Sequence, residues 1–406
     1  MTINNEHKKL NVPNLRFKEF QGEWEKCKVS DLLDFYSTNS LSWDKLEYGT
    51  NAIQNLHYGL IHVGLPTMID LSKDKLPNIT NGNTPKNYEL CQEGDIAFAD
   101  ASEDTNEVAK AVEFYKLKGK DVICGLHTIH GRDNLQKTVV GYKGYAFSST
   151  AFHHQIRRIA QGTKIYSINS KNFSECYIGI PSKEEQKKIA TLLRLIDERI
   201  VTQNKIIDKL QSLIKGIVDC TILRKEKNAI VGDVCSISEQ IRAEANIDDI
   251  ITVRLHGNGV CKSSAENLQL GATQYYRRKA GQLIYGKQNF HNGAIGIVPI
   301  SLDNGITSKD IPSFDIDEMK CNSVYLLAQL QSPQYYKPAE ALTTGTGSKR
   351  LKEETFLKMP IVLPNKREQD DIAVLIHRAS MNLDHAKRLL ELLSIQKQFL
   401  LRQMFI

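Results

Sequence analysis

The stretch IGIPSKEEQKKIATLL at residues 178–193 returns as IVLPNKREQDDIAVLI at residues 361–376, which is 183 residues further along the chain. Around it, residues 162–192 and 345–375 align without a gap, and 11 of these 31 positions are identical. About two identities would be expected from ordinary composition alone. The sequence therefore contains an internal duplication.

Each copy begins a long helix. Proline followed by serine or asparagine, as in Pro181-Ser182 and Pro364-Asn365, with acidic residues close behind, is typical of a capped helix start. Beyond it, apolar residues recur at alternating steps of four and three, which predicts a coiled-coil seam on a helix of about 36 to 40 residues. The pairing residues are expected to be Ile189, Leu193, Ile196, Ile200, Ile207 and Leu210 in the first helix, and Ile372, Ile376, Leu383, Leu390 and Leu393 in the second.

The two helices are expected to pair with each other. Each seam has a polar interruption, at Gln203 and at Lys397. The alternative is that they are core helices of two unrelated domains, but the shared register, length and start favour pairing. If they pair antiparallel, the two halves of the chain are related by an approximate two-fold axis, which suits a ligand that has a dyad of its own, such as duplex DNA.

A globular segment precedes each helix. KVSDLLDF at Lys28 resembles IVGDVCSI at Ile230, and EGDIAFAD at Glu93 resembles AGQLIYGK at Ala280. Short apolar runs between Gly, Asn and Pro predict many strands. The predicted fold class is α+β, with two globular domains separated by two long antiparallel coiled-coil helices in a pseudo-two-fold repeat. The expected domains are residues 1–180, 181–223 (helix), 224–363 and 364–406 (helix).

Composition describes a folded protein with a mild basic excess. There are 53 Lys and Arg against 47 Asp and Glu, giving +6, and hydrophobic residues make up 41%. This balance permits an anionic partner without requiring one. No signal peptide and no run of 18 apolar residues occurs, so we expect a cytoplasmic protein with no membrane partner. The eight cysteines have no paired spacing and are interpreted as small buried hydrophobes.

No catalytic motif is found. GQLIYGKQ at Gly281 has the GxxxxGK spacing of a phosphate loop, but Gln288 stands where Ser or Thr must hold magnesium, and its interior is strand-like. His153 and His154 lack further ligands at convincing spacing, so adjacent surface histidines are favoured over a metal pair. We therefore predict no catalytic residues, no metal site and no cofactor in this chain.

Basic clusters rich in amides and aromatics are the best candidates for a binding function. Lys and Arg suit phosphates and guanine, and Asn and Gln suit adenine. For any single cluster a solvated surface is the alternative. The predicted DNA-binding residues are Lys86, Asn87, His153, Arg157, Arg158, Lys164, Tyr166, Arg277, Arg278, Lys279, Lys287, Gln288, Asn289, Lys349 and Arg350.

With these motifs, the whole sequence resembles the specificity subunits of type I restriction-modification systems. PNLRFKEFQGEW at residues 13–24 is similar to the N-terminal motif of that family. GTKIYSINSKNFSECYIGIPSKEEQKKIATLL and GTGSKRLKEETFLKMPIVLPNKREQDDIAVLI resemble its twice-used conserved region. The second copy matches the family pattern less closely, with Arg367, Asp370 and Asp371 where the first has Glu184, Lys187 and Lys188.

The resemblance implies a DNA-reading component. Each globular domain would be a target recognition domain that reads one half of a bipartite, asymmetric site, and the helices would set the spacer length. Two modification subunits carrying S-adenosylmethionine would methylate adenine, and restriction subunits would add ATP- and Mg-dependent translocation and cleavage. The alternatives are a DNA methyltransferase or fused restriction-methylation enzyme, and a coiled-coil scaffold that does not touch DNA.

Overall fold

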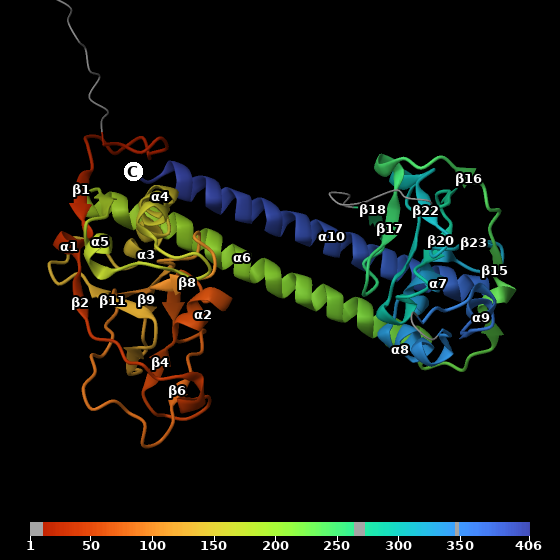
Figure 1. Ribbon diagram of the computed structural model, residues 1–406, viewed down its shortest axis with the longest axis horizontal. Helices are drawn as coiled ribbons and strands as arrows, with labels where there is room; N and C mark the ends of the chain where they lie inside the picture. Colours follow the sequence, from red (N-terminus) through yellow and green to blue (C-terminus); the bar gives the residue numbers. More distant parts are fainter. Residues whose placement is uncertain (1–10, 264–272, 346–348) are drawn as a thin grey trace, which may run out of the picture. The chain divides into compact units, whose positions relative to one another are not determined.

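The computed structural model describes residues 11–263, 273–345 and 349–406. The chain forms two compact units: unit 1 comprises the residues up to Gln203 together with Leu389–Ile406, and unit 2 comprises Asn204–Arg388. Two long helices, α6 (Lys183–Val218) and α10 (Lys366–Gln403), each contribute one part to either unit (Figure 1).

Unit 1 is built on a five-stranded sheet. The strand order is β2 (Asp34–Tyr36), β11 (Thr128–Arg132), β7 (Ile96–Ala99), β9 (Ala111–Lys116) and β5 (Met68–Asp70), and only the β5–β9 pair in this sheet is parallel. The remaining elements of unit 1 are β1 (Glu25–Lys28), α1 (Val29–Leu32), η1 (Trp43–Lys45), β3 (Leu46–Glu47), β4 (Gln54–Leu56), α2 (Tyr58–Val63), β6 (Asn78–Ile79), β8 (Ala101–Ser102), β10 (Val122–Cys124), α3 (Lys143–Phe147), α4 (Thr150–Ile159), β12 (Tyr166–Ser167), α5 (Ser170–Ser174) and β13 (Tyr177–Ile180).

This sheet is buried on both faces. Successive residues of a strand point to opposite faces, so Ile96 and Phe98 of β7 join one apolar core with α3, α4 and the start of α6. Ala97 and Ala99 of the same strand join a second core, which lies against the small sheet of order β10-β4-β6-β3. The near-continuous apolar run of β7 is explained by these two cores.

Unit 2 repeats this plan around the four-stranded sheet β15 (Cys235–Ile237), β23 (Ser313–Ile316), β20 (Leu283–Tyr285) and β21 (Ile295–Ile297). Leu283 and Tyr285 enter its main core, and Ile284 enters a smaller core on the other face. The remaining elements are η2 (Asp219–Leu223), β14 (Ala229–Ile230), η3 (Val231–Asp233), β16 (Arg242–Ala243), η4 (Ile247–Asp249), β17 (Ile251–Val253), β18 (Val260–Lys262), β19 (Tyr275–Arg277), η5 (Phe290–Asn292), η6 (Ile300–Leu302), β22 (Ile306–Ser308), α7 (Ser323–Leu330), α8 (Pro333–Tyr336), η7 (Lys337–Leu342), α9 (Glu353–Leu357) and β24 (Pro360–Ile361).

The weak sequence echoes upstream of the helices correspond to equivalent strands. In unit 1, Gly131 of β11 pairs with Phe35 on one side and Ile96 on the other. In unit 2, Phe314 of β23 pairs with Ile237 and Leu283. Phe35 and Ile237 are the last residues of KVSDLLDF and IVGDVCSI, and Ile96 and Leu283 lie in EGDIAFAD and AGQLIYGK. The duplication therefore extends into the sheets, with the same strand register.

The long helices run antiparallel in each unit. In unit 1, Leu193 and Ile196 near the start of α6 share a core with Leu400 near the end of α10, and Lys397 Nζ lies 2.7 Å from Asp197 Oδ1. In unit 2, the last turn of α6 and η2 share a core with Ile372 and Ile376 at the start of α10. The lengths of 36 and 38 residues confirm the predicted helices.

Both helix starts carry the expected side-chain cap. Ser182 Oγ accepts a hydrogen bond from the Glu185 N–H at 3.3 Å, and Asn365 Oδ1 accepts one from the Glu368 N–H at 3.0 Å. Of the expected seam residues, Ile189, Leu193, Ile196, Ile372, Ile376 and Leu393 are buried, and Ile200, Ile207, Leu210, Leu383 and Leu390 are half-buried. Within the described residues, none of the helices has the length and apolarity needed to cross a membrane.

Candidate nucleic-acid interface

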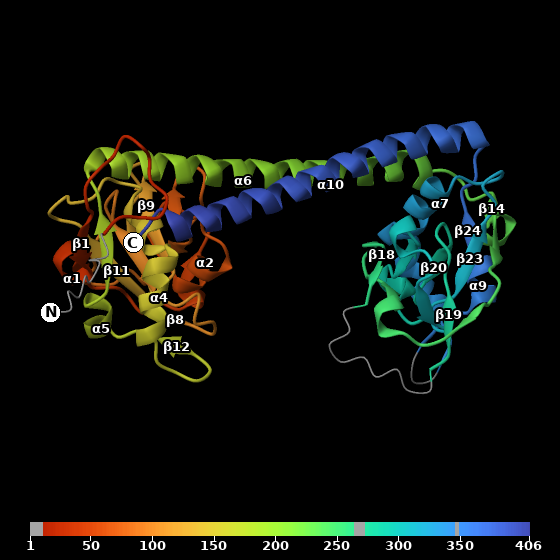
Figure 2. The same ribbon diagram turned by 90° about the horizontal axis from the view of Figure 1, so that it is seen from above.

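One end of unit 1 gathers several of the predicted DNA-binding residues. Arg157 and Arg158 are exposed in the last turn of α4, and Arg157 Nη1 donates a hydrogen bond to Asn106 Oδ1 at 3.0 Å. Tyr166 lies in β12, which pairs with β8, and Lys164 is exposed in the loop that leads into β12. Figure 2 shows α4, β8 and β12 at the same end of the unit. Two segments predicted separately thus contribute to one surface.

A cavity of about 630 Å³ lies beside this surface, and we call it the β8 groove. Aromatic rings contact one another along it: the Tyr58 ring centroid is 5.1 Å from that of His127, and behind it Trp43 is 4.5 Å from His57. The groove is lined by Tyr58, Gly59, His62, Val63, Ala101, Ser102, Glu103, Asp104, Glu107, Lys110, His127 and Ile165.

The lining of the β8 groove is more acidic than basic. Glu103, Asp104 and Glu107 contribute carboxylates, and Lys110 is held by Glu107 at 2.6 Å. Carboxylates repel phosphates, but they accept hydrogen bonds from the amino groups of bases, and aromatic faces contact apolar base surface. The groove is therefore suited to base edges, while Arg157, Arg158 and Lys164 beside it are suited to the DNA backbone.

His127 adopts a backbone conformation that is uncommon for residues other than glycine. It lies in the turn between β10 and β11 with a φ of 54°, in the left-handed region. Its carbonyl accepts a hydrogen bond from the Asp100 N–H at 3.1 Å, and its ring Nδ1 lies 3.2 Å from Asp100 Oδ1. Such backbone positions are costly and cluster at functional sites. His127, Tyr58 and Trp43 were not predicted as binding residues, because none of them lies in a basic cluster of the sequence.

The other predicted residues of unit 1 lie apart from this surface or carry no charge. Lys86 and Asn87 are exposed in the segment between β6 and β7, and among the described residues no hydrogen bond or ion pair joins them to α4 or β12. His153 is half-buried on α4, and burial lowers its pKa, so the ring is neutral at neutral pH. It therefore provides no positive charge for a phosphate.

In unit 2, Asp310 joins two predicted clusters. Arg350 Nη2 lies 3.2 Å from Asp310 Oδ2, and the Asp310 carbonyl accepts a hydrogen bond from the Lys287 N–H at 2.9 Å. Gln288, Asn289 and Lys349 are exposed next to these residues in the chain. We call this set the Asp310 cluster. The remaining predicted residues, Arg277 and Lys279, are exposed at the end of β19, and no polar contact links them to the Asp310 cluster within the described residues.

The structure corrects the assignment of Arg278 as a DNA-binding residue. Arg278 is fully buried, and its guanidinium donates to Thr307 Oγ1 at 2.7 Å, Ser313 Oγ at 2.9 Å and the Ile311 carbonyl at 3.0 Å. Burial lowers its pKa to about 10, which leaves it charged at neutral pH. It is a structural residue that connects β22 to the start of β23.

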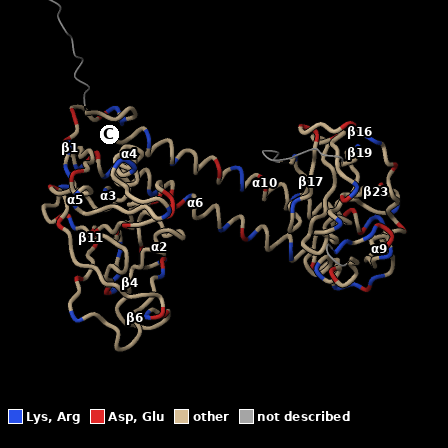
Figure 3. The backbone as a smooth tube through the Cα atoms, in the orientation of Figure 1, with Lys and Arg blue, Asp and Glu red and all other residues tan. Residues whose placement is uncertain are grey.

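The side chain of Lys287 is also largely buried, in an ion pair within unit 2. Its Nζ lies 2.7 Å from Glu353 Oε1 at the start of α9, and 11% of its side chain is exposed. The ion pair holds this side chain away from the surface, so the prediction of a direct DNA contact by Lys287 is wrong. Elsewhere, Lys and Arg are interspersed with Asp and Glu over each unit (Figure 3). Because both signs of charge alternate over the described residues, the contacts of individual residues indicate an interface better than the net charge of a surface does.

The comparisons with known proteins agree with this architecture. Residues 75–212 match the family described as "Type I restriction modification DNA specificity domain". The crystal structure of the type-I restriction-modification system S subunit from M. genitalium superposes with a TM-score of 0.62 at 12% identity, covering 97% of this chain and 99% of that one. A chain from a structure on complex assembly and conformational transition of the type I R-M system gives 0.52 at 12% identity, covering 93% and 96%. No curated protein sequence matches this chain.

At 12% identity the solved structures show that the fold is shared, and the family match identifies the type of domain that residues 75–212 form. The duplicated α+β unit with paired long helices is the fold shared with these structures, and the specificity-domain match lies in unit 1 and the first part of α6. Residues 75–212 belong to the family of type I restriction-modification DNA specificity domains, and the chain has the fold of the S subunit with which it superposes.

Proposed function

We propose that this chain binds DNA sequence-specifically, without catalytic activity of its own, and that each unit reads one half of a bipartite, asymmetric target. The observation that supports this most directly is that the two units share the same strand register but carry different side chains on their candidate binding surfaces. Unit 1 presents the acidic, aromatic β8 groove beside Arg157, whereas unit 2 presents the amide-rich Asp310 cluster. A common scaffold with different side chains is expected to read different bases.

We further propose that the chain directs partner subunits that perform the chemistry. Two modification subunits, carrying S-adenosylmethionine, would methylate adenine in the target, and restriction subunits would use ATP and Mg to translocate and cleave DNA. The exposed apolar side chains of the long helices support a docking role, because such residues are favoured at protein interfaces. They are Leu195, Val201, Leu389, Leu392, Ile395 and Phe399 in unit 1, and Ile206, Leu213, Val374, Leu375 and Met381 in unit 2.

The target proposal is tested by methylation mapping. Single-molecule sequencing of DNA from a host that carries this chain and its modification subunit should give two half-sites and a fixed spacer. Replacing residues 1–160 with the corresponding part of another family member should change one half-site and leave the other as it was. A change in both half-sites would contradict the assignment of one half-site to each unit.

The docking proposal is tested by co-purification with the modification subunit. Leu392→Lys combined with Ile395→Lys places two charges on exposed apolar positions of α10 and should reduce the bound modification subunit at least tenfold. Lys387→Ala, at an exposed polar position of the same helix, is the matched control and should have no effect. Unchanged co-purification of the double variant would exclude this face of α10 as the docking surface.

A further inference from the structure

Three chemically reactive side chains meet in the interior of unit 1. Cys91 precedes β7, Cys124 ends β10 and His130 lies in the middle of β11. The Sγ atoms of the two cysteines are 3.6 Å apart, and one ligand atom from each of the three residues lies within 4.8 Å of the others. All three residues are buried, with exposed fractions of 6%, 1% and 0%.

The ring of His130 is held in one orientation. Its Nε2 lies 2.7 Å from Asp95 Oδ2. A carboxylate only accepts, so Nε2 carries a proton and donates it. The other ring nitrogen, Nδ1, is buried and has no hydrogen-bond partner among the described residues. Buried polar atoms without partners are uncommon, and an imidazole nitrogen of this kind is free to bind a metal ion.

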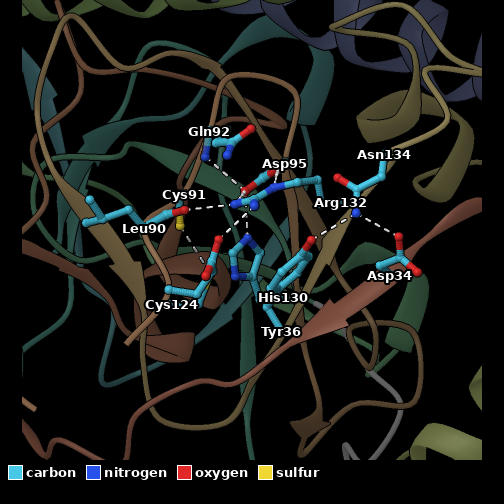
Figure 4. A network of polar contacts seen from close by, with 11 residues as sticks. Asp34, Tyr36, Leu90, Cys91, Gln92, Asp95, Cys124, His130, Arg132 and Asn134 are labelled. Atoms are coloured by element: carbon cyan, nitrogen blue, oxygen red, sulfur yellow. Dashed lines mark hydrogen bonds and ion pairs between the residues drawn. The ribbon is translucent and has the colours of Figure 1, made fainter. Parts of the chain in front are cut away.

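Asp95 is in turn fixed by its own neighbours (Figure 4). Arg132 donates to both carboxylate oxygens of Asp95 at 2.9 Å, and the Gln92 N–H donates to Oδ2 at 2.9 Å. Arg132 also donates to Glu89 and stacks over the Tyr36 ring, with its guanidinium carbon 4.4 Å from the centroid. A histidine whose outer nitrogen donates to an anchored carboxylate is the arrangement that orients imidazole ligands at zinc sites.

The spacing of the two sulfur atoms excludes a disulfide and is compatible with a shared metal ion. Two thiolates bound to zinc at about 2.3 Å in tetrahedral geometry lie about 3.8 Å apart, whereas bonded sulfur atoms lie about 2.05 Å apart. The observed 3.6 Å, at which two free thiols also form a hydrogen bond, excludes a disulfide and is close to the spacing that zinc requires. Two sulfur ligands with one imidazole also form a donor set that zinc prefers over magnesium or calcium.

We propose that Cys91, Cys124 and His130 form a binding site for one Zn²⁺ ion, with Nδ1 of His130 and the two thiolates as ligands. Binding releases the two thiol protons to solvent. Water takes the fourth position, because the described residues bring three Cys, His or carboxylate ligands together here. Zinc would join the segment before β7 to both β10 and β11, which belong to different sheets.

The site has a consequence for the β8 groove. Cys124 and His130 flank the turn that carries His127 in its left-handed conformation. A metal bound at both ends of this turn would hold His127 against Tyr58, which is the wall of the groove. This consequence rests on the proposed function, whereas metal binding itself does not.

Cobalt provides the direct test, because Co²⁺ bound by thiolates gives an intense near-ultraviolet charge-transfer band. The reduced, metal-free full-length chain carrying Cys220→Ser, which removes the exposed thiol, should bind one equivalent of Co²⁺ with this band, and one equivalent of Zn²⁺ should abolish it. Cys91→Ser and Cys124→Ser should each lose the band, and His130→Gln should weaken metal binding at least tenfold. Cys176→Ser, which removes a buried cysteine outside the site, is the matched control and should retain it.

Measurements on the unaltered site keep the test independent of variant folding. Addition of Zn²⁺ to the metal-free chain should raise its Tm, since a ligand that binds the native state stabilises it. The proposal is overturned if protein with reduced thiols gives no cobalt band and if its Tm does not change when Zn²⁺ is added. A Cys91–Cys124 disulfide found by mass spectrometry in freshly purified protein would overturn it as well. DNA binding assayed in parallel separates failure of the metal site from failure of the proposed function.

Discussion

Gln186 and Gln369 make the same three hydrogen bonds, each in its own unit. The Gln186 side-chain oxygen accepts from the Val139 N–H at 2.9 Å, and its amide donates to the carbonyls of Lys137 and Pro181 at 3.1 and 2.9 Å. Gln369 accepts from the Asn322 N–H at 2.9 Å and donates to Lys320 and Pro364 at 3.1 and 2.8 Å. Every partner is displaced by the same 183 residues that separate the two glutamines.

This shared arrangement explains why the EQ dipeptide recurs in both copies. The glutamine is buried in the first turn of each long helix and satisfies backbone groups of the proline segment and of a distant loop. It therefore fixes the direction in which the helix leaves its globular unit. Tyr142 and Tyr325 form a second matched pair, donating to the carbonyls of Gly179 and Val362 at 2.7 and 3.1 Å.

Replacement of these glutamines should destabilise the two units separately. Gln186→Ala leaves three buried backbone groups without their partner and should cost about 2–4 kcal/mol of unfolding free energy. Both tryptophans, Trp24 and Trp43, belong to unit 1. Tryptophan fluorescence in a denaturant titration should therefore report a lower midpoint for Gln186→Ala, whereas Gln369→Ala should lower a transition seen by circular dichroism. Gln211→Ala, on the exposed side of α6, is the control and should change neither.

Two adjacent arginines should separate stability from DNA binding. Arg278→Ala removes a buried guanidinium and should cost about 2–4 kcal/mol, because it opens a cavity and leaves buried acceptors unsatisfied. Arg277→Ala, at an exposed neighbour, should change stability by less than about 0.5 kcal/mol. If Arg277 contacts a phosphate, its loss should lower the slope of log affinity against log salt by about one.

One result for the two arginine variants would contradict the structural role of Arg278. Normal stability of Arg278→Ala with impaired DNA binding would restore Arg278 as a contact residue. Denaturant unfolding and a salt series of DNA-binding isotherms on both variants provide the measurements. The slope is more informative than a single affinity, because phosphate contacts act through counterion release.

The sequence predicted the elements that depend on local periodicity and missed those that depend on strand pairing. The seam of α6 and α10 followed from apolar spacing, and the echo of EGDIAFAD in AGQLIYGK corresponded to equivalent strands. In contrast, YYRRK appeared to be one basic surface, yet Arg278 turns into the core just after the exposed Arg277. Cys91 and Cys124 are 33 residues apart, and only the pairing of sheet strands brings them to His130.

Extending both long helices should change the target spacer without changing either half-site. Seven residues with heptad spacing, inserted after Gln203 in α6 and after Arg388 in α10, lengthen each helix by about 10 Å and keep the seam in register. Because base pairs rise about 3.4 Å each, the spacer should grow by about three base pairs. Methylation mapping gives the spacer directly. An insertion in α6 alone is the control, and it should impair folding because the seams no longer match.

The polar interruption at Lys397 should contribute to the specificity of helix pairing. Its ammonium lies 2.7 Å from Asp197 Oδ1, and Tyr145 Oη donates to the other carboxylate oxygen at 2.9 Å. About a fifth of each charged side chain is exposed, at 22% for Lys397 and 18% for Asp197, so solvent screens this pair less than a pair on the open surface. The coupling energy of the two residues should therefore exceed that of an ordinary surface pair.

A double-mutant cycle measures that coupling. Asp197→Ala, Lys397→Ala and the double variant should give about 0.5–1.5 kcal/mol. The same cycle on Arg194 and Glu198, a more exposed pair one turn apart on α6 at 2.8 Å with 30% and 47% of the side chains exposed, should give about 0.3–0.5 kcal/mol. Raising the salt concentration should reduce the second value more than the first. Equal coupling energies with equal salt sensitivity would show that Lys397 is merely tolerated in the seam, and Lys397→Leu should then stabilise unit 1 by extending the apolar contact with α6.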